Sequence, residues 1–78
     1  MMNDTRHGFE WALSQLKIGC KVARKGWNGV GMWAALQQPS TDSKMTRPYL
    51  YLKAVDGTLG PWLPTQTDLL SHDWVIVE

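Results

Sequence analysis

The chain has 78 residues, so we expect a single domain spanning residues 1–78, and a core this small usually needs a disulfide, a metal or a second subunit to stabilise it. Cys20 is the only cysteine, which excludes an intrachain disulfide and favours oligomerisation as the stabilising device. Eight Lys and Arg residues against seven Asp and Glu argue against the basic surface of a duplex DNA- or RNA-binding protein, and no apolar stretch is long enough to predict a membrane span.

The first predicted element is a helix. Apolar residues between Phe9 and Leu16 recur at the spacing of one helical face, and Gly19 follows as a natural stop. Asp4 or Thr5 is expected to cap its start.

The chain start lacks the apolar core of a signal peptide, and a free thiol suits a reducing compartment, so we expect a cytoplasmic protein.

Two strands joined by a tight loop are predicted next. Residues 20–24 alternate in character and are typical of a short strand. Residues 25–31 contain Asn28-Gly29, the strongest short turn signal, with Gly31 adding freedom for a positive φ angle. Residues 32–36 form an apolar run of strand length, which we predict to be a central strand.

The following segment predicts a loop and a hairpin. Residues 37–47 are polar and disfavour a packed regular element. Pro48 opens a strand in which Tyr49, Tyr51 and Lys53 point to one side. Residues 56–57, Asp-Gly, predict a hairpin turn into a return strand that begins at residues 58–59 and is expected to be interrupted by the Gly-Pro pair at residues 60–61.

The last segment predicts a short helix and a strand. Thr65 followed by Asp68 resembles a capping box that opens a helix through Leu70, and the β-branched run at residues 74–77 predicts a final strand. The predicted fold is therefore α+β, with an N-terminal helix packed on a mainly antiparallel sheet and a short second helix near the C-terminus.

Five tryptophans in so short a chain suit either a core or a stacking site. Arg24, Lys25, Trp27 and Asn28 place two cations, a ring and an amide around a glycine-rich turn, which suits a phosphorylated nucleobase ligand. The same turn could instead be a structural hairpin with Trp27 packed on the sheet. Composition alone favours that structural interpretation.

A second group of polar residues follows the rigid corner at residues 61–64. The helix start at Gln66, Thr67 and Asp68 offers free backbone amides, although Asp68 argues against a plain phosphate cradle. Asp68 could cap the helix, accept hydrogen bonds from a ribose or an amine, or do both. Gln66 and Thr67 would be assigned as merely solvated without other information.

Catalysis and metal binding find little support in the sequence. No serine has the context of an activated nucleophile, and neither His7 nor His72 has neighbouring thiols or a partner motif. The carboxylates are explained by turns and helix ends, and no Walker or dinucleotide-binding glycine motif is present. We therefore predict no enzyme, no metal and no cofactor.

The segments VARKGWNG at residues 22–29 and PWLPTQTDLL at residues 61–70, followed by Asp73-Trp74, resemble the second Thoeris anti-defence family. The resemblance spans nearly the whole chain. It implies a homotetrameric phage protein that acts in the cytoplasm of the infected bacterium as a sponge, holding cyclic ADP-ribose isomers made by Thoeris enzymes in pockets between protomers. Some relatives also bind cyclic dinucleotides of CBASS systems, so a second ligand class is possible. The loop at residues 37–47 departs from the family in length and composition.

With this resemblance, Trp27 and Trp62 or Trp74 are expected to stack on or enclose a base, and Arg24 and Lys25 to meet phosphates. The polar edges of the ligand would be read by Asn28, Gln66, Thr67 and Asp68. Tyr51, with Tyr49 beside it, is a further ligand candidate that could instead form a subunit interface. A single-stranded nucleic-acid-binding module and a hydrolase of the same signal remain the rival hypotheses.

Overall fold

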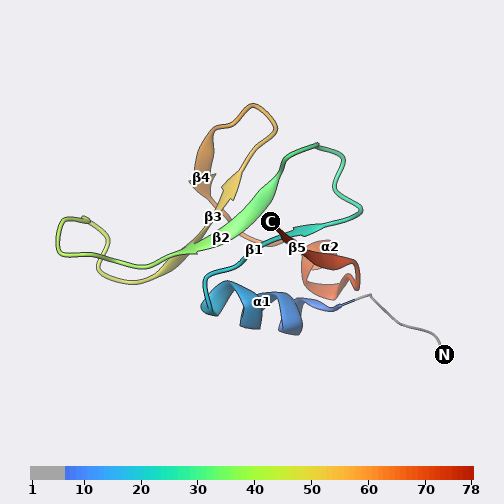
Figure 1. Cartoon of the computed structure of the whole chain (residues 1–78), viewed down its shortest axis with the longest axis horizontal. Coiled ribbons are helices and arrows are strands. Elements are labelled where there is room, and N and C mark those ends of the chain that lie inside the picture. Colours follow the sequence, from blue (N-terminus) through green and yellow to red (C-terminus); the bar gives the residue numbers. More distant parts are fainter. Residues whose placement is uncertain (1–6) are drawn as a thin grey trace.

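The computed structural model describes residues 7–78 and contains two helices and a five-stranded antiparallel sheet with strand order β4-β3-β2-β1-β5 (Figure 1). The elements along the chain are α1 (Phe9–Lys17), β1 (Lys21–Arg24), β2 (Trp33–Gln37), β3 (Tyr49–Lys53), β4 (Leu59–Pro61), α2 (Gln66–Leu70) and β5 (Trp74–Val77). The predicted α+β class is confirmed, and so is the central position of the strand that follows the glycine-rich loop. None of the described helices is long and apolar enough to cross a membrane.

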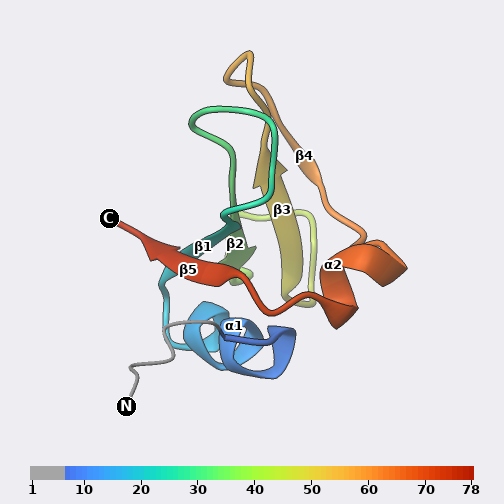
Figure 2. The same cartoon turned by 90° about the vertical axis from the view of Figure 1, so that its right-hand side faces the viewer.

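Helix α1 packs its apolar stripe on one face of the sheet (Figure 2). Ala12 and Leu16 are fully buried, as the helical spacing requires. The N-cap is Gly8, which offers no side-chain hydrogen bond to the helix start. The caps expected at Asp4 or Thr5 lie outside the described residues.

The core lies between α1 and the sheet and is centred on Trp74. Alternation along the strands sends Val22, Ala34 and Trp74 towards the helix, where all three are fully buried. Complete burial of a large apolar side chain stabilises the fold by about 1.5–3 kcal/mol. The side chains at alternate positions, such as Trp33 and Val75, point to the opposite sheet face, which neither helix covers.

The β1–β2 connection, residues 25–32, extends the loop predicted at residues 25–31 by one residue. Asn28-Gly29 does not form a two-residue turn, because Gly31 and not Gly29 has a positive φ, of 84°. Gly29 serves close packing instead: a Cβ atom there would collide with the side chains of Val55 and Met32. The predicted loop and the positive φ at Gly31 are therefore confirmed, whereas the close packing of Gly29 had no sequence signal.

The β3–β4 hairpin has the predicted Asp56-Gly57 turn, with Gly57 at a φ of 89°. The predicted interruption at Gly60-Pro61 is wrong, since both residues belong to β4. Pro61 is tolerated because Trp62 N–H donates to Leu50 C=O across 3.0 Å, which places the Pro61 nitrogen on the outer side of this edge strand.

The other elements predicted in the second half of the chain are confirmed, except that Gln37 belongs to β2 and Pro48 precedes β3. Residues 38–48 contain no helix or strand. Thr65 caps α2 in a capping box with Asp68: the Thr65 hydroxyl accepts from Asp68 N–H, and the Asp68 carboxylate accepts from Thr65 N–H, each at 3.1 Å. Strand β5 follows and pairs with β1, which brings the start of α2 beside the end of β1.

Candidate ligand-binding site

Two carboxylates hold the guanidinium group of Arg24 where β1 ends. Arg24 Nε donates to Asp73 Oδ1 across 2.9 Å, and Nη1 donates to Asp68 Oδ1 across 3.1 Å. Asp73 Oδ2 also accepts from the backbone N–H of Gly26 across 2.8 Å. These contacts tie the beginning of the β1–β2 loop to α2 and to the residue before β5.

Asp68 is the centre of this network. Its Oδ1 accepts from Trp27 Nε1 across 3.2 Å as well as from Arg24, and its backbone carbonyl accepts from Trp74 Nε1 across 3.0 Å. Burial acts to raise the pKa of Asp68, but hydrogen bonds from Thr65, Trp27 and Arg24 outweigh it and lower the pKa below its ordinary value. Asp68 therefore remains an anion that accepts hydrogen bonds from β1, from the β1–β2 loop and from the cap of its own helix.

Asp73 and Arg24 stabilise each other's charged forms. The Arg24 hydrogen bond is the largest influence that lowers the pKa of Asp73, and the N–H of Gly26 acts in the same direction. In turn the hydrogen bond to Asp73 raises the pKa of Arg24, and Asp68 adds to that effect. Side-chain exposures of 15% for Arg24 and 9% for Asp68 leave little of this pair open to a ligand.

An aromatic cluster backs this network. Trp27, Trp62 and Trp74 meet edge to face, with ring centroids 5.4–6.0 Å apart, and Phe9 of α1 packs on both Trp62 and Trp74. Edge-to-face contacts of this kind contribute about 0.5–1.5 kcal/mol beyond the burial of area. Trp74 is fully buried, whereas Trp27 and Trp62 are only partly buried and keep some surface for other contacts.

The exposed side of Trp27 borders a groove of about 630 Å³, which we call the loop groove. Its walls come from the β1–β2 loop and the β3–β4 turn, and its lining residues are Trp27, Asn28, Gly29, Val30, Met32 and Val55. Lys25 is exposed in the same loop. A ring, an amide and a cation thus lie along one glycine-rich segment whose start is fixed by Asp68 and Asp73.

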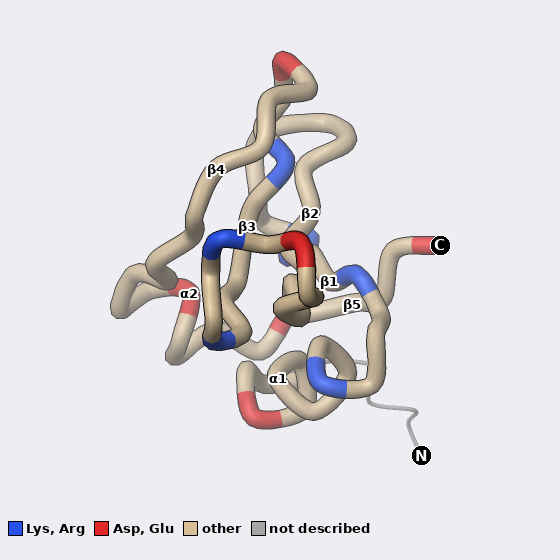
Figure 3. The backbone as a smooth tube through the Cα atoms, turned by 90° about the vertical axis from the view of Figure 1, so that its left-hand side faces the viewer, with Lys and Arg blue, Asp and Glu red and all other residues tan. Residues whose placement is uncertain are grey.

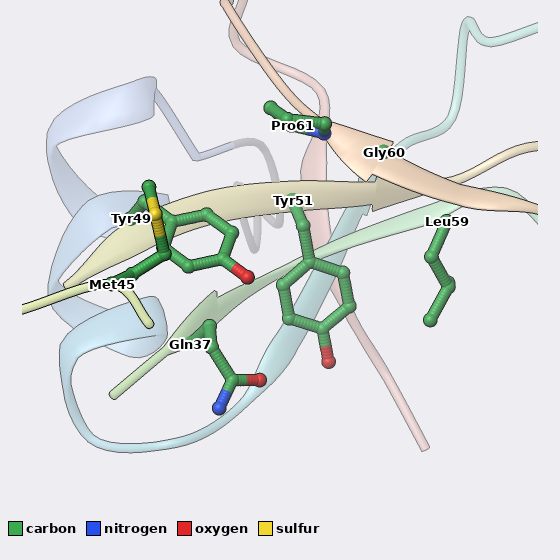
Figure 4. Close-up of a pocket in the computed structure, with 7 residues that line it drawn as sticks. All are labelled: Gln37, Met45, Tyr49, Tyr51, Leu59, Gly60 and Pro61. Carbon is green, nitrogen blue, oxygen red and sulfur yellow. The ribbon is translucent and has the colours of Figure 1, made fainter. Parts of the chain in front are cut away.

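A second groove, of about 420 Å³, lies on the sheet face that the helices leave uncovered, and we call it the sheet groove (Figure 4). The side chains of Tyr49, Tyr51 and Gln37 project from β3 and β2 to the same side (Figure 4). Met45, Leu59, Gly60 and Pro61 complete its lining.

Beside the sheet groove, the same face carries an aromatic pair under a cation. The rings of Trp33 and Tyr51 meet edge to face with their centroids 5.9 Å apart, and Lys21 Nζ lies 4.8 Å from the centroid of the Trp33 ring. This face therefore offers ring surfaces and positive charge. Elsewhere the charges are mixed, with Lys and Arg positions interspersed with Asp and Glu along the described chain (Figure 3).

Comparison with known proteins identifies the family. The model of the Thoeris anti-defense 2-like domain matches residues 7–77. The chain belongs to the Thoeris anti-defense 2-like family. It is 31% identical over 86 aligned residues to Thoeris anti-defense 2 of Bacillus phage SP01, an alignment that covers 94% of this chain and 97% of the relative. Because that alignment is longer than the 78 residues of this chain, the relative has insertions with respect to it. The family resemblance inferred from the sequence is confirmed.

Within this Thoeris anti-defense 2-like domain, the residues singled out in the sequence fall into three places. One set lies together in the Asp68 network and its aromatic backing: Arg24, Trp27, Trp62, Asp68 and Trp74. A second set is exposed near it, in the loop or on the first turn of α2: Lys25, Asn28, Gln66 and Thr67. Tyr51 is separate, on the opposite face of the sheet.

Sequence reasoning missed Asp73 as a member of the network. It was explained as a helix end, yet it makes two hydrogen bonds with Arg24 and one with Gly26 N–H. The Asp-Trp pair at residues 73–74 was part of the family resemblance and is the signal that could have revealed it. Val55, which lines the loop groove from the β3–β4 turn, had no sequence signal. Among residues 7–78, no group of three His, Cys, Asp or Glu side chains is placed to hold a metal ion.

Proposed function

We propose that this protein counters Thoeris defence as a sponge: it binds the cyclic nucleotide signal in the cytoplasm of the infected bacterium and sequesters it without breaking a bond. Membership of the Thoeris anti-defense 2-like family supports the anti-defence role. The observation that carries the binding role is the position of Trp27, whose indole is anchored by Asp68 while its remaining surface borders the loop groove beside Asn28.

An anchored ring favours binding because its conformational entropy is already lost before the ligand arrives. Stacking of a base on an aromatic side chain contributes about 1–3 kcal/mol in single-strand binders. Lys25 then supplies a positive charge for a phosphate, and Asn28 supplies a donor and an acceptor for the edge of a base or ribose.

Arg24 has a different role in this proposal. Its guanidinium is occupied by two carboxylates, so a phosphate could bind it only by competing with Asp68 and Asp73. We assign Arg24 to holding the loop and α2 together. Trp74, being fully buried, supports Trp27 and Trp62 from behind.

The loop groove is open to solvent, and the proposed homo-oligomer, a tetramer as the family resemblance implies, supplies the missing wall. Gln66 and Thr67 on α2 and Tyr51 on the uncovered sheet face are the proposed contacts from other surfaces. Since Tyr51 and Trp27 lie on opposite faces of one sheet, a ligand that touches both contacts them in different copies.

Sequestration requires only tight, stoichiometric binding, because each occupied pocket removes one signal molecule from the pool that activates the defence effector. We would titrate the protein with a panel of cyclic ADP-ribose isomers and cyclic dinucleotides by calorimetry, and measure mass and stoichiometry by native mass spectrometry. Binding of at least one of these with release of the intact ligand after denaturation is the expected result.

Two other results would contradict the proposal. Recovery of a cleaved ligand would indicate a hydrolase. Binding of single-stranded oligonucleotides that weakens steeply with salt, without binding of any cyclic nucleotide, would indicate a nucleic-acid-binding module that uses the rings and lysines of the uncovered sheet face.

A further inference from the structure

The two edges of the sheet differ in their capacity to accept another strand. Strand β4 forms one edge and β5 the other (Figure 2). On β4, the backbone groups of Leu59 and Pro61 face outward, and Pro61 has no N–H to donate. Proline at such a position blocks strand addition, a common way for proteins to protect a sheet edge.

Strand β5 has no such protection. Its sequence, Trp-Val-Ile-Val, is apolar and largely β-branched, and it carries no charged side chain. Charged residues and proline are the features that usually prevent edge-to-edge pairing. Their absence leaves β5 competent to pair along its outer side.

The direction of the β5 backbone groups follows from its pairing with β1. Lys25 N–H donates to Asp73 C=O across 3.0 Å, so Arg24 and Trp74 form a pair without direct hydrogen bonds between them. Such pairs alternate along an antiparallel ladder, so Val22 and Ile76 form the next one. The N–H and C=O of Ile76 therefore point away from β1, towards the outer edge.

The outer side of β5 is occupied only near its beginning in the part of the chain that the structure describes. There His7 C=O accepts from Trp74 N–H across 3.1 Å. Beyond that point the outward groups are the C=O of Trp74 and both backbone groups of Ile76, a residue that is 41% exposed.

We propose that β5 pairs with β5 of a second copy in an antiparallel arrangement centred on Ile76, which joins the two sheets into one continuous sheet. This arrangement is self-complementary: the N–H of each Ile76 meets the C=O of the other across a twofold axis, and each Trp74 C=O meets the N–H of the partner's Glu78. Because Pro61 blocks the opposite edge, the pairing closes at two copies and does not continue into a fibre.

This inference specifies one interface of the homo-oligomer in the proposed function, but its test involves no ligand, so the two can fail separately. In a Cys20→Ser background, Ile76→Cys would place two thiols opposite each other at a Cα separation of about 5.5 Å, which suits a disulfide. We expect a covalent dimer on mild oxidation, seen as a doubled mass under non-reducing conditions.

The matched control is Val75→Cys in the same background. In the proposed register residue 75 lies opposite residue 77 of the partner, so the two introduced thiols would be too far apart to bond and the protein should stay largely monomeric on a non-reducing gel. A covalent dimer of the Val75→Cys variant in place of the Ile76→Cys variant, or no covalent dimer of either, would overturn the proposal.

A second measurement does not depend on oxidation. Ile76→Lys places a charge at the centre of the proposed interface and should halve the mass of the native assembly measured by light scattering, with each protomer still folded by circular dichroism. Ile18→Lys, at a 72% exposed apolar residue that follows α1 and lines neither groove, is the control and should leave the mass unchanged. Equal masses for the two variants would count against pairing through β5.

Discussion

The indole nitrogen of Trp27 donates a hydrogen bond to Oδ1 of Asp68 across 3.2 Å, and this contact joins the glycine-rich β1–β2 loop to the first turn of α2. Arg24 donates to the same oxygen. Asp68, which completes the capping box of the five-residue helix α2, thereby also fixes the ring that borders the loop groove. The position of Trp27 consequently depends on a carboxylate that lies 41 residues further along the chain.

Asp68→Asn should destabilise the protein while preserving its shape. The amide retains one acceptor oxygen but loses the charge that binds Arg24, which keeps only Asp73 as a partner. Loss of a charge-assisted hydrogen bond of this kind costs about 1.5–3 kcal/mol. Urea denaturation would measure the change, with Asp42→Asn in the exposed 38–48 loop as the control that should stay close to wild type. Equal stabilities for the two variants would show that the network contributes little.

Much of the fold could be predicted from local patterns because they encode local geometry. The apolar residues from Phe9 to Leu16 recur at the spacing of one helical face, and the Thr65–Asp68 capping box is complete within four residues. The packing of the β1–β2 loop could not be predicted in the same way, since Gly29 is required by contacts with Val55 and Met32 and not by its own φ angle.

The sequence predicted most residues of the candidate site but not the contacts that each of them makes. Arg24 and Trp27 were noticed because cations and rings suit a nucleotide, yet both turn out to donate to Asp68. The tertiary fold decides which group pairs with a charged side chain. Here β5 must lie beside β1 before Asp73 can reach Arg24. No sequence pattern within one element contains that information.

The fall in the free energy of unfolding at acidic pH should depend on Asp68. Its pKa is lowered in the folded protein from an ordinary value of 3.8, so the carboxylate contributes stability that is complete above that value and is lost as the pH falls through the lowered folded pKa. Asp73 acts in the same direction. We expect the stability difference between wild type and Asp68→Asn to be constant near neutral pH and to shrink below about pH 4. Unfolding free energies measured from pH 7 to pH 2 would check this, and a difference that grows on acidification would contradict the assigned sign.

Trp27→Leu should weaken ligand binding selectively. Loss of a stacking ring that contributes about 1–3 kcal/mol corresponds to a loss of affinity of about 5- to 150-fold. Trp11→Leu is the matched control, since Trp11 lies on α1, where its ring stacks on His7, and lines neither groove. Calorimetry with the ligand identified in the panel would measure both. A similar loss in the two variants would indicate that the ligand does not use the loop groove.

Trp27→Phe separates the ring from its anchor. Phenylalanine keeps a face for stacking but has no N–H for Asp68, so the ring would lose its fixed orientation. Affinity between those of wild type and Trp27→Leu is expected, with stability lowered by about 1 kcal/mol for the lost hydrogen bond. Wild-type affinity in Trp27→Phe, together with lowered stability, would mean that the anchor serves the fold and not the ligand.

Gly29→Ala tests whether the close approach between the β1–β2 loop and the β3–β4 turn shapes the loop groove. The added methyl group would collide with Val55 and Met32, and relief of overpacking of this kind typically costs about 1–3 kcal/mol. Gly60→Ala is the control, because a Cβ atom there meets no other atom within 4 Å and the backbone has no positive φ. We expect Gly29→Ala to lower the unfolding temperature and the affinity for ligand together, since both Val55 and Met32 line the groove that must open to admit the methyl group. If Gly29→Ala lost stability but bound ligand as tightly as the wild type, the ligand would lie elsewhere, and the sheet groove around Tyr49 and Tyr51 would become the site to test next.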